Sequence, residues 1–86
     1  MTQLLFRDDP YLRSCEATVV AVRENVVELD RTVFYPVGGG QPGDSGRIGD
    51  SRVTDTLKGE GETVLHALEP GAAVPQVGAK VLAEID

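Results

Sequence analysis

Apolar and polar side chains alternate with a period of two along much of this chain, and that period is typical of β-strands. The clearest stretch runs from Cys15 to Arg23 and is rich in β-branched residues. Strict alternation there predicts one face made by the odd-numbered residues Cys15, Ala17, Val19 and Ala21. The pattern therefore predicts a long strand with one face directed at a core.

Four further stretches have the same character, namely Val26 to Tyr35, Ser51 to Lys58, Glu62 to Leu68 and Ala79 to Ile85. Glu24-Asn25 is predicted to be a tight turn, because Asn tolerates left-handed backbone. A bend is expected near Asp30, and Gly59-Glu60-Gly61 is predicted to join the two middle stretches as a hairpin. No segment shows a sustained helical period of apolar residues.

Roughly five to seven short strands with frequent turn signals predict an all-β fold, a small closed or nearly closed antiparallel β-barrel. Closure removes the exposed strand edges that invite aggregation. An open sandwich or meander is the alternative.

The composition predicts one domain over residues 1–86. A chain of 86 residues with 41% apolar residues can enclose one core and no more. No apolar run reaches the length of a membrane span, and the first residues lack the basic leader and apolar segment of a secretory signal. Cys15 is the single cysteine, so no internal disulfide can form, which fits a cytoplasmic protein.

The most unusual stretch runs from Leu29 to Gly46, where a β-type segment leads directly into Gly38-Gly39-Gly40. Gln41 follows, and Pro42-Gly43-Asp44 makes a second turn, with Asp44 expected to cap it through an Asx-type bond. Consecutive glycines cost conformational entropy and add no packing, so a fold keeps them where the backbone passes close to something. A ligand or a neighbouring domain is expected there, and a plain hairpin loop is the alternative.

This stretch closely resembles the glycine-rich motif of the alanyl-tRNA editing family, which comprises the editing part of alanyl-tRNA synthetase and free-standing AlaX-type deacylases. The resemblance covers nearly the whole chain, including Phe6, Asp9 to Leu12, Val53 to Asp55 and Val77 to Asp86. Val37 departs from it, since family members often place an acidic or small residue there. The resemblance implies a β-barrel similar to the second domain of translation elongation factors.

Enzymes of this family hydrolyse the ester between a wrong amino acid and tRNA at a zinc site formed by His-x-x-x-His and Cys-x-x-x-His motifs. Here His66 and Cys15 are the single histidine and cysteine, and they lack that spacing. A catalytic zinc normally needs three protein ligands, so no metal site is expected in this chain. His66 is expected to be structural, and Cys15 a small buried apolar group. The resemblance thus implies a non-catalytic N-terminal domain, inactive alone, whose zinc-dependent C-terminal catalytic domain is absent from the chain.

The function that the resemblance implies is trans-editing of mischarged tRNA(Ala), with hydrolysis of Ser-tRNA(Ala) or Gly-tRNA(Ala) by the full-length protein. Gly38, Gly39 and Gly40 would shape the substrate cleft, and Gln41 would contact substrate. Thr32 would hydrogen-bond the hydroxyl of a wrongly attached serine, which an alanine lacks. The open alternatives are a Gln41 that bonds its own backbone and a Thr32 chosen for strand propensity.

Two other classes of function remain open: a scaffold or interaction module without substrate contact, and a fragment of an alanyl-tRNA synthetase. Charge bears on tRNA binding, because eight basic residues are scattered among fourteen acidic ones and the net charge is −6. Affinity for nucleic acid usually comes from clustered Lys and Arg. The domain alone is therefore expected to bind tRNA weakly or not at all.

Overall fold

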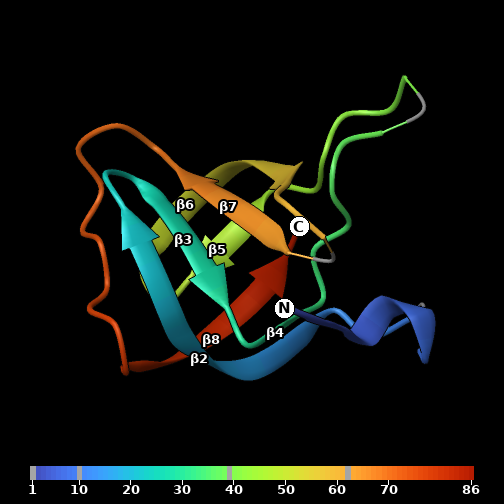
Figure 1. Ribbon diagram of the computed structural model, residues 1–86, viewed down its shortest axis with the longest axis horizontal. Helices are drawn as coiled ribbons and strands as arrows, with labels where there is room; N and C mark the ends of the chain where they lie inside the picture. Colours follow the sequence, from blue (N-terminus) through green and yellow to red (C-terminus); the bar gives the residue numbers. More distant parts are fainter. Residues whose placement is uncertain (1, 10, 39, 62) are drawn as a thin grey trace.

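The computed structural model describes residues 2–9, 11–38, 40–61 and 63–86, and its architecture is all-β. Six antiparallel strands close into a barrel in the order β2-β3-β7-β6-β5-β8 (Figure 1). Their bounds are β2 (Ser14–Arg23), β3 (Val26–Leu29), β5 (Gly46–Ile48), β6 (Ser51–Lys58), β7 (Val64–Leu68) and β8 (Lys80–Ile85). The predicted small antiparallel barrel is confirmed.

A second, two-stranded sheet lies beside the barrel. In it β1 (Gln3–Leu4) pairs in parallel with β4 (Arg31–Thr32), and β1 leads directly into the short 3₁₀ turn η1 (Leu5–Arg7). The predicted strand from Val26 to Tyr35 is thus divided by a bend at Asp30 into β3 and β4 and ends at Thr32. The periodicity did not reveal β1, because two residues are too few to show an alternation.

Strand β2 contains an irregularity that the alternation did not predict. Its register with β3 shifts between Val19 and Ala21, as expected for a β-bulge. A bulge inserts one extra residue and reverses which side chains face inward. Ala21 is consequently exposed, whereas Val22 packs against the core, so the prediction that placed Ala21 on one face with Ala17 and Val19 is wrong.

The predicted turn at Glu24-Asn25 is present, but the left-handed residue is Glu24, with φ of 55°. Asn25 acts through its side chain instead: its amide donates to the carbonyl oxygen of Leu68 at 2.7 Å. This bond joins the β2–β3 turn to the end of β7.

Two side-chain hydrogen bonds fix the bend at Asp30 to β2. The Asp30 carboxylate accepts from the backbone N–H of Thr18 at 2.8 Å, and the Arg31 guanidinium donates to the carbonyl oxygen of Glu16 at 2.7 Å. These bonds hold the start of β4 in place, and β4 is the element that leads into the glycine-rich segment.

The core is a single cluster of buried apolar side chains: Ala17, Val19, Val27, Leu29, Val33, Phe34, Ile48, Val53, Leu68 and Ala83. Phe34 belongs to this core, whereas its neighbour Tyr35 is 56% exposed at the rim. Cys15 is half-buried against the cluster, and this burial raises the pKa of its thiol. Within the described ranges, no helix has the length and apolar character needed to cross a bilayer.

Candidate functional site

The segment from Tyr35 to Ser45, which we call the glycine loop, projects away from the barrel (Figure 1, green). Near its tip the two arms pair, because the N–H of Gln41 donates to the carbonyl oxygen of Gly38 at 2.9 Å and the N–H of Gly38 donates back at 3.2 Å. Gly40 has φ of 82°, a left-handed conformation that favours glycine. The predicted contact at Gly39 lies outside the described residues.

Gln41 is exposed at this tip. Among the described residues, no side-chain hydrogen bond joins its carboxamide to another group. The alternative in which Gln41 only bonds its own loop is therefore not what this geometry shows. The amide donors and the acceptor face outward and are available to a ligand.

The base of the glycine loop is anchored to β6 by hydrogen bonds around Thr56. The N–H of Val37 donates to the carbonyl oxygen of Thr56 at 2.8 Å, and the Thr56 hydroxyl donates to the carbonyl oxygen of Asp44 at 2.7 Å. Across the loop, the N–H of Tyr35 donates to the Asp44 carboxylate at 2.8 Å. Asp44 thus joins the two arms of the loop, and the predicted local Asx-type cap is wrong.

Gly43 allows this close contact with β6. A Cβ atom at Gly43 would lie 2.1 Å from the carbonyl oxygen of Thr56, well inside any tolerable separation. The N–H of Gly43 also donates to the Asp55 carboxylate at 3.2 Å. The backbone here lies directly against the barrel, while the tip extends outward.

Thr32, the other predicted substrate contact, is fully buried. Its hydroxyl oxygen lies 2.8 Å from Nε2 of His66 and accepts from the N–H of Phe34 at 3.0 Å. Both bonds are made inside the barrel. The predicted contact of Thr32 with substrate finds no support in this geometry, which agrees with the alternative of a Thr chosen for strand propensity.

His66 completes this buried network. Its Nδ1 lies 2.9 Å from the carbonyl oxygen of Val27, which can only accept, so Nδ1 carries the proton and Nε2 accepts from Thr32. Its ring meets Phe34 edge to face, with centroids 5.1 Å apart. Burial lowers the pKa of His66 to about 4, so the imidazole is neutral at physiological pH. The predicted structural role is confirmed.

These contacts do not fit a zinc ion. Both ring nitrogens of His66 are already hydrogen-bonded in the interior. Among the described residues, no group of three or more His, Cys, Asp or Glu side chains is placed to hold a metal. We therefore derive no step through zinc in this domain.

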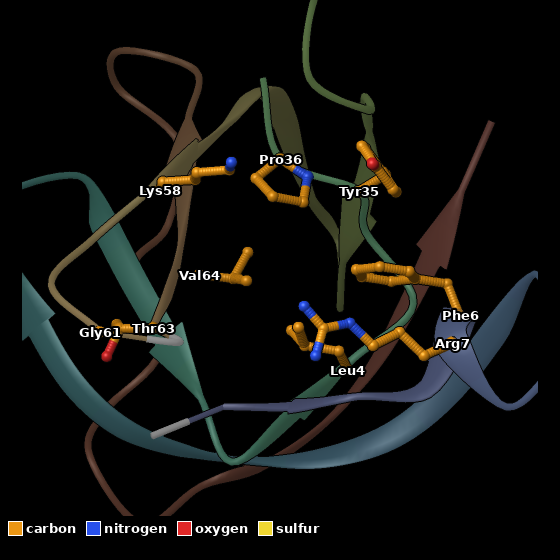
Figure 2. A pocket seen from close by; sticks show the side chains of 9 residues that line it. All are labelled: Leu4, Phe6, Arg7, Tyr35, Pro36, Lys58, Gly61, Thr63 and Val64. Carbon is orange, nitrogen blue, oxygen red and sulfur yellow. The ribbon is translucent and has the colours of Figure 1, made fainter. Parts of the chain in front are cut away.

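A pocket of about 440 Å³ opens beside the base of the glycine loop (Figure 2). Its described lining comes from three segments of the chain: Leu4, Phe6 and Arg7, then Tyr35 and Pro36, and finally Lys58, Gly61, Thr63 and Val64. Its volume is within the range of about 300–1,000 Å³ typical of small-ligand sites. Sequence reasoning missed this pocket, because its three walls are far apart along the chain.

Comparison with known proteins identifies the family of this chain. The family described as tRNA synthetases class II (A) matches residues 9–86, nearly the whole chain. The chain belongs to this family. Within the family, its similarity to editing proteins is extensive: it is 40% identical over 86 residues to the alanyl-tRNA editing protein AlaX-M of Pyrococcus horikoshii, covering 100% of this chain and 39% of that protein.

Two further relatives of the family bear on function. The alanyl-tRNA editing protein AlaX-L of Pyrococcus horikoshii is 40% identical over 94 residues, covering 100% of this chain and 23% of that protein. The alanine–tRNA ligase of Methanococcus aeolicus is 44% identical over 68 residues, covering 79% of this chain and 8% of the ligase. The chain thus spans less than two-fifths of the length of each relative, and the resemblance to the alanyl-tRNA editing family is confirmed.

Proposed function

We propose that this domain is the non-catalytic N-terminal part of a trans-editing deacylase that hydrolyses Ser-tRNA(Ala) or Gly-tRNA(Ala). Its role is to shape the substrate cleft with the glycine loop, while a separate zinc-dependent domain performs the hydrolysis. The similarity over the whole chain to two proteins named for alanyl-tRNA editing supports this assignment.

The observation that carries the proposal is the position of Gln41. Its carboxamide is exposed at the end of a loop whose base is tied to the barrel by Thr56 and Asp44. A rigid base and an unoccupied polar tip are what a substrate contact requires, because a positioned donor loses little entropy on binding. A loop built only for packing would gain nothing from an exposed amide.

In the proposed reaction, the Gln41 amide donates a hydrogen bond to the carbonyl oxygen of the aminoacyl ester. Negative charge grows on that oxygen when water adds to the ester, so a fixed donor stabilises the transition state more than the ground state. Groups other than Thr32 would have to recognise the hydroxyl of a wrongly attached serine, because the Thr32 hydroxyl is already hydrogen-bonded in the interior.

The test is a chimera in which this domain replaces the matching region of the AlaX-M relative. The readout is deacylation of Ser-tRNA(Ala) under single-turnover conditions. We expect Gln41→Ala to lower the rate about tenfold or more, the loss typical of one hydrogen bond made in the transition state. Gln76→Ala is the matched control, because Gln76 is an exposed glutamine in a different loop.

The scaffold hypothesis gives a different result. If the domain only holds the catalytic domain in place, Gln41→Ala and Gln76→Ala will deacylate Ser-tRNA(Ala) at the same rate as the parent chimera. That outcome would reject the substrate contact and favour an interaction module.

A further inference from the structure

The pocket beside the glycine loop combines aromatic and cationic side chains. Phe6 and Tyr35 meet at one wall with ring centroids 4.9 Å apart and planes tilted by 51°. Phe6 is half-buried, whereas Tyr35 is 56% exposed. The supported tyrosine ring therefore offers an open face at the pocket rim, held in position by Phe6.

Among the described residues that line the pocket, the charged ones are Arg7 and Lys58, and both are basic. Figure 2 shows Lys58 and Arg7 at different sides of the pocket. None of the described lining residues is acidic, in a chain whose net charge is −6. The Lys58 ammonium is thus a local positive charge in a domain that is negative as a whole.

Lys58 also connects the pocket to the glycine loop. A Cβ atom at Gly38 would lie 3.6 Å from the Lys58 Nζ, so the missing side chain at Gly38 leaves the loop backbone next to the ammonium. The pocket and the loop tip are close along the chain as well. Five residue steps separate Pro36 from Gln41, so the two residues lie at most about 18 Å apart.

We propose that this pocket binds one nucleotide of single-stranded RNA, with the base stacked on Tyr35 and its phosphate paired with Lys58. Stacking on an aromatic side chain beside a cationic groove is the general means by which proteins hold single strands. The proposed ligand is a nucleotide at the 3′ end of an RNA strand. A free nucleotide has the same base and phosphate and is the alternative ligand.

This inference rests on the proposed function, because it places the strand that carries the aminoacyl ester. A nucleotide held beside Tyr35 and Pro36 lies next to the loop that ends in Gln41. The pocket would then set the direction in which the RNA end passes along the loop, and the Gln41 amide would meet the ester beyond it.

The test is an NMR titration of the 86-residue domain with the trinucleotide CCA, the sequence at tRNA 3′ ends. We expect saturable shifts at amides around the pocket, including Phe6, Tyr35 and Val64. Lys58→Gln should weaken binding about three- to tenfold and lower the slope of log affinity against log salt by about 0.7. Tyr35→Ala should weaken binding about fivefold or more.

The chain provides one matched control for each variant. Lys80→Gln changes the only other lysine, on β8, and Tyr11→Ala changes the only other tyrosine, which is 89% exposed. Both controls should bind CCA like the parent domain. Spectral dispersion of each variant reports whether it is folded.

Several outcomes would overturn the proposal. They are the absence of saturable shifts at the pocket, equal losses in Lys58→Gln and Lys80→Gln, and equal losses in Tyr35→Ala and Tyr11→Ala. Cytidine monophosphate binding as tightly as CCA would indicate a free nucleotide, and inorganic phosphate binding as tightly would indicate an anion site without a base. The Gln41 role is measured separately, by deacylation in the AlaX-M chimera, so failure of the pocket and failure of the Gln41 role are distinct results.

Discussion

His66 shows how one buried side chain connects the barrel to the glycine loop. Its imidazole is hydrogen-bonded to Val27 of β3 on one side and to Thr32 of β4 on the other. The Thr32 hydroxyl in turn accepts a hydrogen bond from the N–H of Phe34. The network fixes the backbone just before the loop begins. Thr32 and His66 thus hold this backbone from the interior, and the exposed Gln41 lies further along the chain.

The free energy of unfolding is predicted to depend on the protonation of His66. Its pKa is about 4 in the folded domain and near 6.5 in the unfolded chain, so the unfolded chain binds the proton more readily. The His66 contribution to the free energy of unfolding should therefore be complete above pH 6.5 and decrease as the pH drops towards 4. The total decrease should be about 3 kcal/mol. Urea unfolding at a series of pH values measures this dependence.

The matched variant is His66→Gln, whose amide can still donate to Val27 and accept from Thr32. It should be less stable at pH 7 but should lack the change between pH 6.5 and 4. The carboxyl of Asp86 also has a lowered pKa, because Arg52 and Ser45 hydrogen-bond it. The His66→Gln variant keeps these bonds, so the contribution of Asp86 is the same in both proteins. An unchanged pH dependence in His66→Gln would contradict the assignment to His66.

At the scale of elements, the attachment of the glycine loop to β6 decides where the tip points. Val37 and Gly43 approach β6 from the two arms of the loop, and Thr56 receives one bond and donates another. The approach is possible only because position 43 has no side chain.

Gly43→Ala is predicted to destabilise the domain by about 1–3 kcal/mol, the cost typical of an inserted methyl without space. Gly38→Ala is the control, because its Cβ would meet Lys58 at an ordinary contact distance of 3.6 Å. We expect its effect to stay within about 1 kcal/mol. Urea unfolding compares the two, and equal stabilities would show that the loop can shift away from β6.

The elements differ in how well the sequence predicted them. Strands β2, β6 and β7 are long enough for alternation to identify them, and their predicted ranges agree closely with the observed ones. The bulge in β2 was missed, because Val20 and Val22 are equally apolar in sequence while the bulge alone decides that Val22 faces the core. Gln41 was identifiable from its motif, whereas the pocket depends on contacts between distant segments.

At the scale of the whole molecule, charge opposes the binding of a large polyanion. Fourteen acidic and eight basic residues give the net charge of −6, and the pocket is a local exception. One nucleotide contact releases few counterions and so supports only weak affinity. In the deacylase proposed above, the separate catalytic domain would have to supply most of the affinity for tRNA.

The isolated domain is accordingly predicted to bind intact tRNA(Ala) more weakly than micromolar, even at low salt. Fluorescence titration of labelled tRNA at about 50 mM salt measures this, with the complete AlaX-M relative as the reference. A dissociation constant in the micromolar range or below for the domain alone would contradict it.

The sequence by itself determined the strand content, the family and the glycine-rich loop with Gln41, because each depends on local composition or on a continuous motif. Only the tertiary structure decided that Thr32 is sealed inside against His66, that Asp44 bonds across the loop, and that Phe6, Tyr35 and Lys58 share a pocket. These features arise from barrel closure, which brings together side chains that no local pattern relates.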